Sequence, residues 1–208
     1  MMEAEKYLSY LQKEIHSAVF ATVDNLGNPV TCVIDIMFAD KEGLYFLTAK
    51  GKAFYFRLKA NNSVSITGFH GADTMTSKSI SICGKVKEIG NELIPFLFEK
   101  NPYMNEIYPT KKQQEALTVF QLYQGNGEWF DLSKRPIERE NFSFGGVDKI
   151  NDGYFISDKC NGCKQCYSFC PQKCIEFMEQ TATIKQEHCL HCGNCFKNCP
   201  VGAVVKRS

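Results

Sequence analysis

Residues 160–171 have the sequence CNGCKQCYSFCP, and residues 189–200 repeat the same cysteine spacing as CLHCGNCFKNCP. In each stretch three cysteines follow one another at three-residue steps, and a fourth comes after three intervening residues, directly before a proline. Three thiolates at that step can surround one cubic iron–sulfur cluster, whereas the fourth is displaced far enough to reach a neighbouring cluster. Together the two stretches predict two [4Fe–4S] clusters in a small C-terminal lobe.

The interleaving of the two stretches also predicts which cysteines share a cluster. One cluster is expected to be held by the first three cysteines of the first stretch and the last of the second, namely Cys160, Cys163, Cys166 and Cys199. The other is expected to be held by Cys189, Cys192, Cys195 and Cys170.

Disulfides and zinc are the alternatives for these cysteines. Disulfide-dense frameworks are typical of secreted chains, and this sequence begins MMEAEK without the apolar segment of a secretory signal. Zinc ribbons use Cys-x-x-Cys pairs separated by a long gap, which leaves a third cysteine at the same short step unexplained. The spacing therefore favours iron–sulfur clusters.

The repeat extends beyond the ligands, at the offset of 29 residues that separates Cys160 from Cys189. Residues 154–156 align with 183–185 as a short strand entering each loop, and residues 174–176 align with 203–205 as a strand leaving it. Cys174 then corresponds to an alanine, so we expect it to be a small packed residue rather than a ligand. The segment resembles a two-cluster ferredoxin domain, which we place at residues 146–208.

The rest of the chain is expected to form a domain of its own. The N-terminal 145 residues are enough to bury a core, and they hold most of the 16 phenylalanines and 9 tyrosines. No apolar run reaches the length of about 18 residues that a membrane span needs. Lys and Arg number 24 against 23 Asp and Glu, which gives no excess of positive charge for nucleic acid. We expect a cytoplasmic redox protein with neither membrane nor nucleic-acid partners.

The pattern of apolar residues predicts an α+β domain built on a small antiparallel barrel. Helical spacing predicts helices over residues 3–16, 52–61, 91–100 and 111–117. Alternation between turn signals predicts strands over residues 18–23, 30–38, 44–48, 63–67 and 79–87. A last hairpin is expected to pair residues 119–123 with 128–132 around a turn at 124–127.

Residues 3–145 resemble the pyridoxamine 5′-phosphate oxidase-like FMN-binding split barrel. The resemblance is clearest in AVFATVDNLGNPVTCVIDIMFADKEGLYFLTAKGKAFYFRLKANNSVSITGF, residues 18–69. The later segments GNGEWFDLSKRP and FSFGG are similar to those of such barrels that have a ferredoxin tail. The implied fold class is α+β, with an antiparallel split β-barrel over residues 1–145 followed by the small ferredoxin-like domain at 146–208.

The resemblance implies an FMN site. In the family, the strand after a Gly-x-Pro turn lines the flavin ring, and this strand corresponds to Val30, Thr31, Cys32, Val33 and Ile34. A threonine that ends the next strand matches Thr48. A basic residue that binds the phosphate at the start of the following helix matches Lys52, with Lys50 close by.

The chemistry of the loop agrees with a phosphate site. A flavin phosphate needs donors that converge from a loop and a helix N-terminus. Thr48 offers a hydroxyl, Gly51 allows close approach of the backbone, and Lys50 and Lys52 supply positive charge. The alternative is an ordinary solvated connection between a strand and a helix.

Four further residues, in or next to predicted strands, have chemistry that a site could use. Trp129 can stack near a flavin across a subunit boundary or fill the barrel from a strand, and we favour the strand. Cys32 and Cys83 lie in predicted strands and are expected in the core. His70 is expected to end a strand rather than to bind haem.

Clusters and flavin together predict an oxidoreductase. A [4Fe–4S] cluster moves one electron, whereas a flavin exchanges one or two. We expect an FMN-dependent enzyme that passes electrons from a redox partner protein or a reduced nicotinamide donor to a small-molecule acceptor of flavin or nitro-aromatic type. No catalytic acid or base is identifiable in the sequence, and the resemblance implies a homodimer with flavin at the subunit junction.

Two other functions remain open. The first is a non-enzymatic adaptor that passes electrons between redox proteins, with the flavin as a relay. The second is a ferredoxin whose barrel holds no flavin and only joins two copies of the chain.

Overall fold

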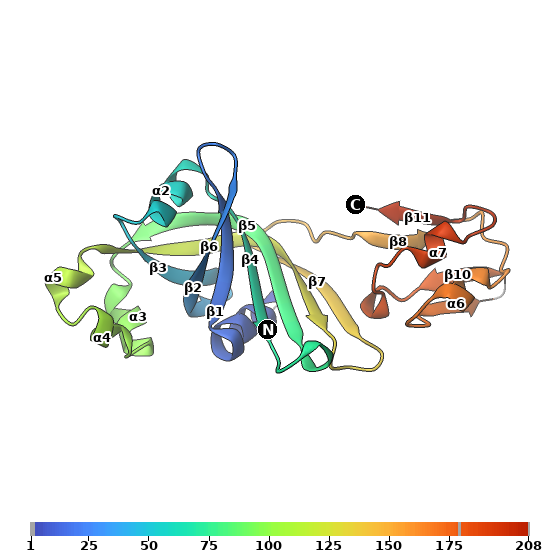
Figure 1. The fold of residues 1–208 in the computed structure, drawn as a ribbon, viewed down its shortest axis with the longest axis horizontal. Coiled ribbons are helices and arrows are strands. Elements are labelled where there is room, and N and C mark those ends of the chain that lie inside the picture. The colour runs from blue at the N-terminus through green and yellow to red at the C-terminus, as the bar shows by residue number, and fades with distance from the viewer. Residues whose placement is uncertain (1–2, 179, 208) are drawn as a thin grey trace.

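The computed structural model describes residues 3–178 and 180–207, with an N-terminal barrel and a small C-terminal lobe lying along one axis (Figure 1). The elements of the N-terminal part are, in order, α1 (Glu3–Tyr10), η1 (Leu11–Ile15), β1 (Ser17–Val23), β2 (Pro29–Asp40), β3 (Gly43–Ala49), α2 (Ala53–Ala60), β4 (Ser63–His70), η2 (Thr74–Thr76), β5 (Lys78–Gly90), α3 (Ile94–Lys100), α4 (Met104–Ile107), α5 (Lys111–Gln114), β6 (Leu117–Asp131) and β7 (Glu138–Phe144). The lobe contains β8 (Gly153–Ile156), α6 (Gln165–Phe169), β9 (Ile175–Met178), β10 (Thr181–Ile184), η3 (Gln186–His188), α7 (Asn194–Lys197) and β11 (Val204–Arg207).

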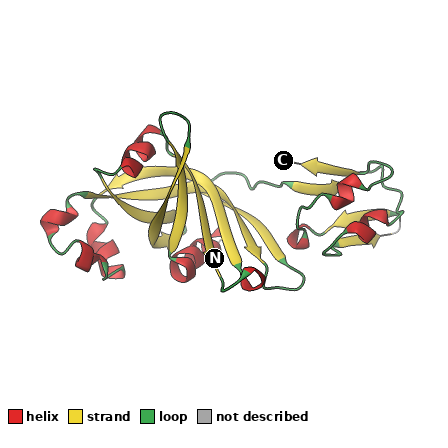
Figure 2. Ribbon diagram, viewed as in Figure 1, coloured by secondary structure: helices red, strands yellow, loops and turns green. Residues whose placement is uncertain are grey.

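The predicted antiparallel barrel is confirmed. Its strands are hydrogen-bonded in the order β3-β2-β1-β4-β5-β6, and pairing of β3 with β6 closes the ring. Strand β7 pairs with β6 outside this ring. Helices lie around the outside of the barrel (Figure 2).

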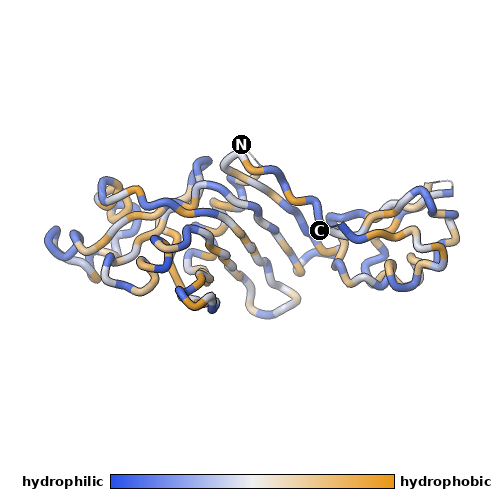
Figure 3. The backbone as a smooth tube through the Cα atoms, turned by 90° about the horizontal axis from the view of Figure 1, so that it is seen from above, coloured by the Kyte–Doolittle hydropathy of each residue, from blue (hydrophilic) through white to orange (hydrophobic). Residues whose placement is uncertain are grey.

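Alternation along the strands builds the barrel core. In β1, Ala18, Phe20 and Thr22 are buried while the residues between them are more exposed, and Figure 3 shows apolar and polar residues alternating along the barrel strands. The rings of Phe46 and Phe120 stack at 5.8 Å between centroids. Each such side chain stabilises the fold by roughly 1.5–3 kcal/mol through burial.

The predicted hairpin at residues 119–132 is wrong, because β6 runs unbroken through it. The glycines expected to form a turn are instead places of close approach. A Cβ at Gly125 would lie 2.8 Å from the carbonyl oxygen of Cys83, and one at Gly127 would lie 2.3 Å from the ring of Phe142. The partner that covers the second half of β6 is β7, which the sequence pattern did not predict.

The predicted helix over residues 111–117 is also too long. It ends at Gln114, because Leu117 already pairs with Ala49 in the closing ladder of the barrel. Within the described ranges, the structure contains no helix that is long and apolar enough to cross a membrane.

The C-terminal lobe follows the sequence repeat. Strand β8, which enters the first cysteine loop, pairs with β11, which leaves the second. In the same way β9, which leaves the first loop, pairs with β10, which enters the second. Each strand pair therefore combines one strand from the first half of the repeat with one from the second. This arrangement confirms the predicted α+β ferredoxin-like fold.

Candidate iron–sulfur and flavin sites

Four cysteines line one pocket of the lobe, and we call them the proximal group: Cys170, Cys189, Cys192 and Cys195. Burial raises the pKa of the Cys195 thiol to about 11, and the charges of the other three cysteines add to the rise. The structure thus brings together the four residues that the interleaved spacing assigns to one cluster.

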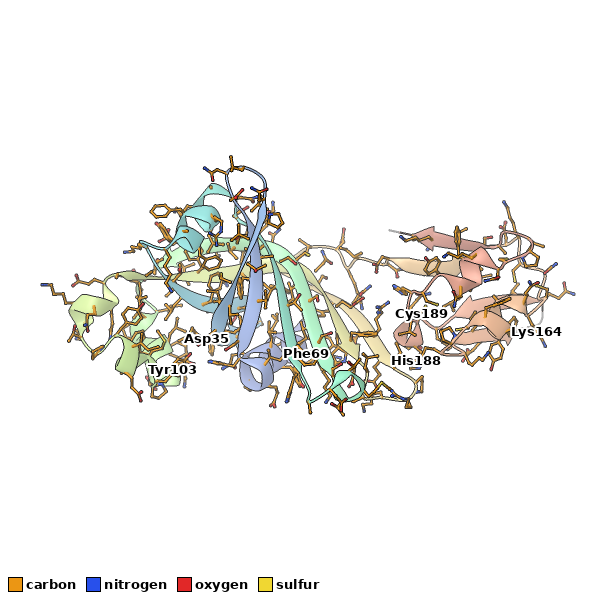
Figure 4. All side chains as sticks on the ribbon, viewed as in Figure 1. Asp35, Phe69, Tyr103, Lys164, His188 and Cys189 are labelled. Atoms are coloured by element: carbon orange, nitrogen blue, oxygen red, sulfur yellow. The ribbon has the colours of Figure 1, made fainter. Side chains whose placement is uncertain are left out.

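The other four cysteines form the distal group: Cys160, Cys163, Cys166 and Cys199. Burial raises the pKa of the Cys166 thiol, and the charges of the other three again add to the rise. Figure 4 shows Cys189 on the side of the lobe that faces the barrel and Lys164, which lies between two distal cysteines in the sequence, at the opposite end.

Backbone amides point at the sulfur atoms in both groups. The amide of His191 donates to Sγ of Cys189 at 3.4 Å, and the amide of Ala203 donates to Sγ of Cys199 at 3.2 Å. Burial opposes ionisation of Cys199, but its pKa is lowered because this effect is outweighed by backbone hydrogen bonds from Ala203, Val201, Val204 and Gly202. Donors that stabilise a thiolate are what a cluster ligand needs, so the residues present fit [4Fe–4S] clusters.

Cys174 lies beside the proximal group. Its side chain is buried, and its Sγ lies 3.5 Å from that of Cys170. Its counterpart in the repeat, Ala203, is buried as well. The position is therefore a packed one, in line with the expectation for a small residue.

The strand predicted to line the flavin divides its side chains between two faces. Cys32 and Ile34 lie against the barrel core, and Val30 is half-buried on the same side of β2. Thr31 and Val33 point outward, and the side chain of Val33 is 66% exposed. Only the outward pair and the strand backbone are open to a ligand on the outer face.

The predicted phosphate loop is open to solvent. Lys50, Gly51 and Lys52 are exposed, and Lys52 is the N-cap of α2. The hydroxyl of Thr48 is buried and has no hydrogen-bond partner among residues 3–178 and 180–207. A buried hydroxyl next to two lysines fits the phosphate and ribityl part of FMN.

Arg57 is a cation that the sequence analysis missed. It extends from α2, and its Nε donates to Thr22 Oγ1 at 2.8 Å. With Asp24, Phe56 and Asn61 it lines a surface groove beside the predicted phosphate loop. Its position on the helix that follows the predicted phosphate loop was the available signal.

The prediction that Cys83 lies in the core is wrong. It is exposed on the outer face of β5, because its neighbours Ile82 and Gly84 take the other side of the strand. Cys32 lies half-buried against the barrel core, as does Trp129, which stacks on Tyr7. His70 ends β4 and is hydrogen-bonded to the hydroxyl of Tyr10.

The junction between lobe and barrel was not predicted. Element η3 packs against β7, and Nδ1 of His188 lies 2.8 Å from the carbonyl oxygen of Ile137. On β7 the side chain of Arg139 is only 14% exposed, and its Nε lies 3.1 Å from Oε2 of Glu128. Because His188 directly precedes Cys189, the sequence could have indicated that His188 lies near a cluster. No pattern in the sequence indicated a role for Arg139.

Comparison with known proteins finds matches to the lobe. Residues 159–203 match the model of the 4Fe-4S dicluster domain. A stretch of 51 residues is 40% identical to pyruvate synthase subunit PorD of Methanothermobacter marburgensis, and it covers 24% of this chain and 59% of that protein. This chain therefore spans less than two thirds of that relative's length.

The barrel is similar to solved structures over about two thirds of the chain. A NimC/NimA family protein from Clostridium acetobutylicum matches with a TM-score of 0.57 and 20% identity, over 67% of this chain and 92% of that one. A protein of the same organism, related to general stress protein 26 in the pyridoxinephosphate oxidase family, matches with a TM-score of 0.50 and 16% identity, over 67% of this chain and 94% of that one.

These matches confirm both resemblances at the level of the fold. The chain joins a closed six-stranded antiparallel barrel, whose fold is similar to that of these two solved structures, to a C-terminal segment that matches the 4Fe-4S dicluster domain. The ferredoxin-like domain supports a function in electron transfer and redox chemistry.

Proposed function

We propose that this protein is an FMN-dependent iron–sulfur oxidoreductase that takes single electrons into two [4Fe–4S] clusters and delivers them to a small-molecule acceptor at the barrel. The observation that supports it most is the packing of η3, the element directly before Cys189, against strand β7 of the barrel. A ferredoxin-like domain that only exchanged electrons with other proteins would not need its cysteine loop against the second domain.

When bound, the clusters would supply one-electron transfer and the FMN would supply one- or two-electron transfer. The chain's own residues hold and shield these groups. The distal and proximal cysteines are the ligands, and the amides of His191 and Ala203 stabilise the charge on their sulfur atoms. Thr48, Lys50 and Lys52 would bind the phosphate end of FMN, and Thr31 and Val33 on the outer face of β2 would line its ring.

We further propose a homodimer through the outer face of β2, β1, β4 and β5. On this face Val19 pairs with Val33 on one side and with Thr67 on the other, and Thr67 pairs in turn with Ser81. Val19 and Val33 are 43% and 66% exposed, and none of the four residues is charged. A patch of exposed valines and uncharged residues on this face fits burial against a second copy, which would then enclose the flavin between subunits.

Analysis of anaerobically purified protein tests the cofactor set. We expect about eight irons, matching acid-labile sulfide and one FMN per chain. Lys52→Ala should weaken FMN retention at unchanged iron content, whereas Lys134→Ala should change neither, because Lys134 follows the end of β6 that is opposite to Leu117, the partner of Ala49. Flavin content that is the same in both variants would contradict the phosphate assignment.

Turnover separates the enzyme from the adaptor. With a reduced ferredoxin or NADH as donor, we expect steady-state reduction of a nitro-aromatic compound or free flavin. Clusters that are reduced and re-oxidised by partner proteins without any such turnover would favour the adaptor. A chain with full iron but no affinity for FMN would favour the scaffold.

A further inference from the structure

The distal and proximal groups differ in exposure. In the distal group only Cys166 is buried, whereas in the proximal group only Cys192 is exposed. Cys189 of the proximal group also lies on the side of the lobe that faces the barrel, and Lys164 of the distal loop lies at the free end of the lobe (Figure 4). A one-electron donor therefore has direct access to the distal end, and the barrel has direct access to the proximal end.

One barrel residue, Arg139, lies opposite the loop that contains Cys189. A cavity on one side of it is lined by Arg139 together with Gln186 and His191, and a second cavity is lined by Arg139 together with His188. The two histidines flank Cys189 in the sequence. The guanidinium of Arg139 is thus placed at the proximal group from outside the domain that contains the cysteines.

The charge of Arg139 is shielded from water. Its Nε and Nη1 atoms are buried and make no hydrogen bond of normal geometry to any residue in the described part of the chain, although Nε is 3.1 Å from Glu128. The guanidinium carbon lies 4.9 Å from the ring centroid of Phe130. Interactions of a buried charge are screened much less than those of a surface lysine.

Charged side chains from the barrel, the linker and the lobe lie around the guanidinium of Arg139. Burial raises the pKa of Glu128, against the opposing effect of Arg139. The other acids that line the two cavities are Glu138, Glu140, Asp152 and Glu187, and the lysines that line them are Lys6 and Lys149.

We propose that Arg139 raises the reduction potential of the proximal cluster above that of the distal cluster, and so directs electrons from the free end of the lobe toward the barrel. In each step the distal cluster loses the one electron that the proximal cluster gains, and no bond or proton is transferred. Reduction makes a cluster more negative, and a buried positive charge beside it stabilises the reduced form. Arg139 is a positioning residue of the electron path, and its role depends on the proposed function in that both clusters must be present.

Potentiometric titration of the anaerobic full-length protein, followed by electron paramagnetic resonance, tests this. Cys192→Ala first identifies the proximal signal as the one that is lost. Arg139→Gln is then expected to lower the equilibrium constant for reduction of the proximal cluster about tenfold, which is about 59 mV for a one-electron couple, at an unchanged distal potential. Arg139→Lys should restore most of the shift because it keeps the charge.

Glu128→Gln provides an independent variant of opposite sign. It removes the carboxylate beside Arg139 and should raise the proximal potential, so it remains informative if Arg139→Gln does not fold. Proximal potentials that stay unchanged in both variants, or that move equally with the distal one, would overturn the role of Arg139. A wild-type protein without two [4Fe–4S] signals would instead overturn the proposed function itself.

Discussion

The hydroxyl of Thr48 gives a test in which stability and ligand binding change in opposite directions. In the substitution Thr48→Val a methyl group replaces the hydroxyl at nearly constant volume. Thr48 is 3% exposed, and its Oγ1 has no hydrogen-bond partner in the described residues. A buried polar group without a partner costs roughly 1–3 kcal/mol, so the flavin-free variant should be more stable than the wild type, by about 1 kcal/mol.

Binding of FMN should change the other way. If Thr48 donates to a charged ligand, losing that hydrogen bond costs roughly 1.5–3 kcal/mol. That range corresponds to a loss of FMN affinity on the order of tenfold to a hundredfold. Stability is measured by urea unfolding of the flavin-free chain through the fluorescence of Trp129, the single tryptophan, and affinity by fluorescence titration with FMN.

Thr118 is the matched control, because it faces Thr48 across the closing ladder of the barrel. It is fully buried, and its hydroxyl donates to Oε1 of Glu88 at 2.8 Å. Thr118→Val should therefore destabilise the protein by about 1–2 kcal/mol. If Thr48→Val destabilises in the same way and leaves FMN affinity unchanged, the hydroxyl of Thr48 does not serve a ligand and the reasoning fails.

Other substitutions test the cysteine groups and the barrel. Cys163→Ala removes one distal ligand, so iron should fall from about eight toward four per chain while the proximal signal remains; loss of both clusters or of neither would contradict the grouping. Cys174→Ala should retain the full iron content, and a loss of iron would make Cys174 a ligand. Gly127→Ala places a Cβ 2.3 Å from the ring of Phe142 and should lower stability by about 1–3 kcal/mol in thermal unfolding. Gly51→Ala, with nothing within 4 Å of its Cβ, is the control that should not.

The sequence was most informative where spacing along the chain determines geometry. A cluster-binding loop needs its ligands a few residues apart, so the cysteine runs predicted both groups and their interleaving. The offset of the repeat likewise predicted the four short strands of the lobe and the packed position of Cys174. Alternation in β1 and β2 predicted the barrel because one face of each strand must be buried.

Prediction failed where distant segments determine the outcome. Residues 124–127 have the composition of a turn, but Gly125 and Gly127 are small because Cys83 and Phe142 lie against them. Strand β7 has charged residues at three of its seven positions and no clear alternation, so only its partner β6 determines that it is a strand. Arg139 could not be found in advance, since its role depends on how the lobe and the barrel are packed together.

The position of β7 has a further consequence. It is the last strand of the large sheet, so one side of its backbone has no strand partner within that sheet. The lobe lies beside it, through η3 and through the contact of His188 with Ile137, while Asn141 donates to the linker carbonyl of Ile150. An unprotected strand edge is a template for pairing with other chains. The iron–sulfur lobe would then also prevent the edge of β7 from pairing with strands of other chains. A barrel truncated after residue 145 should therefore be prone to aggregate even if its own core is intact.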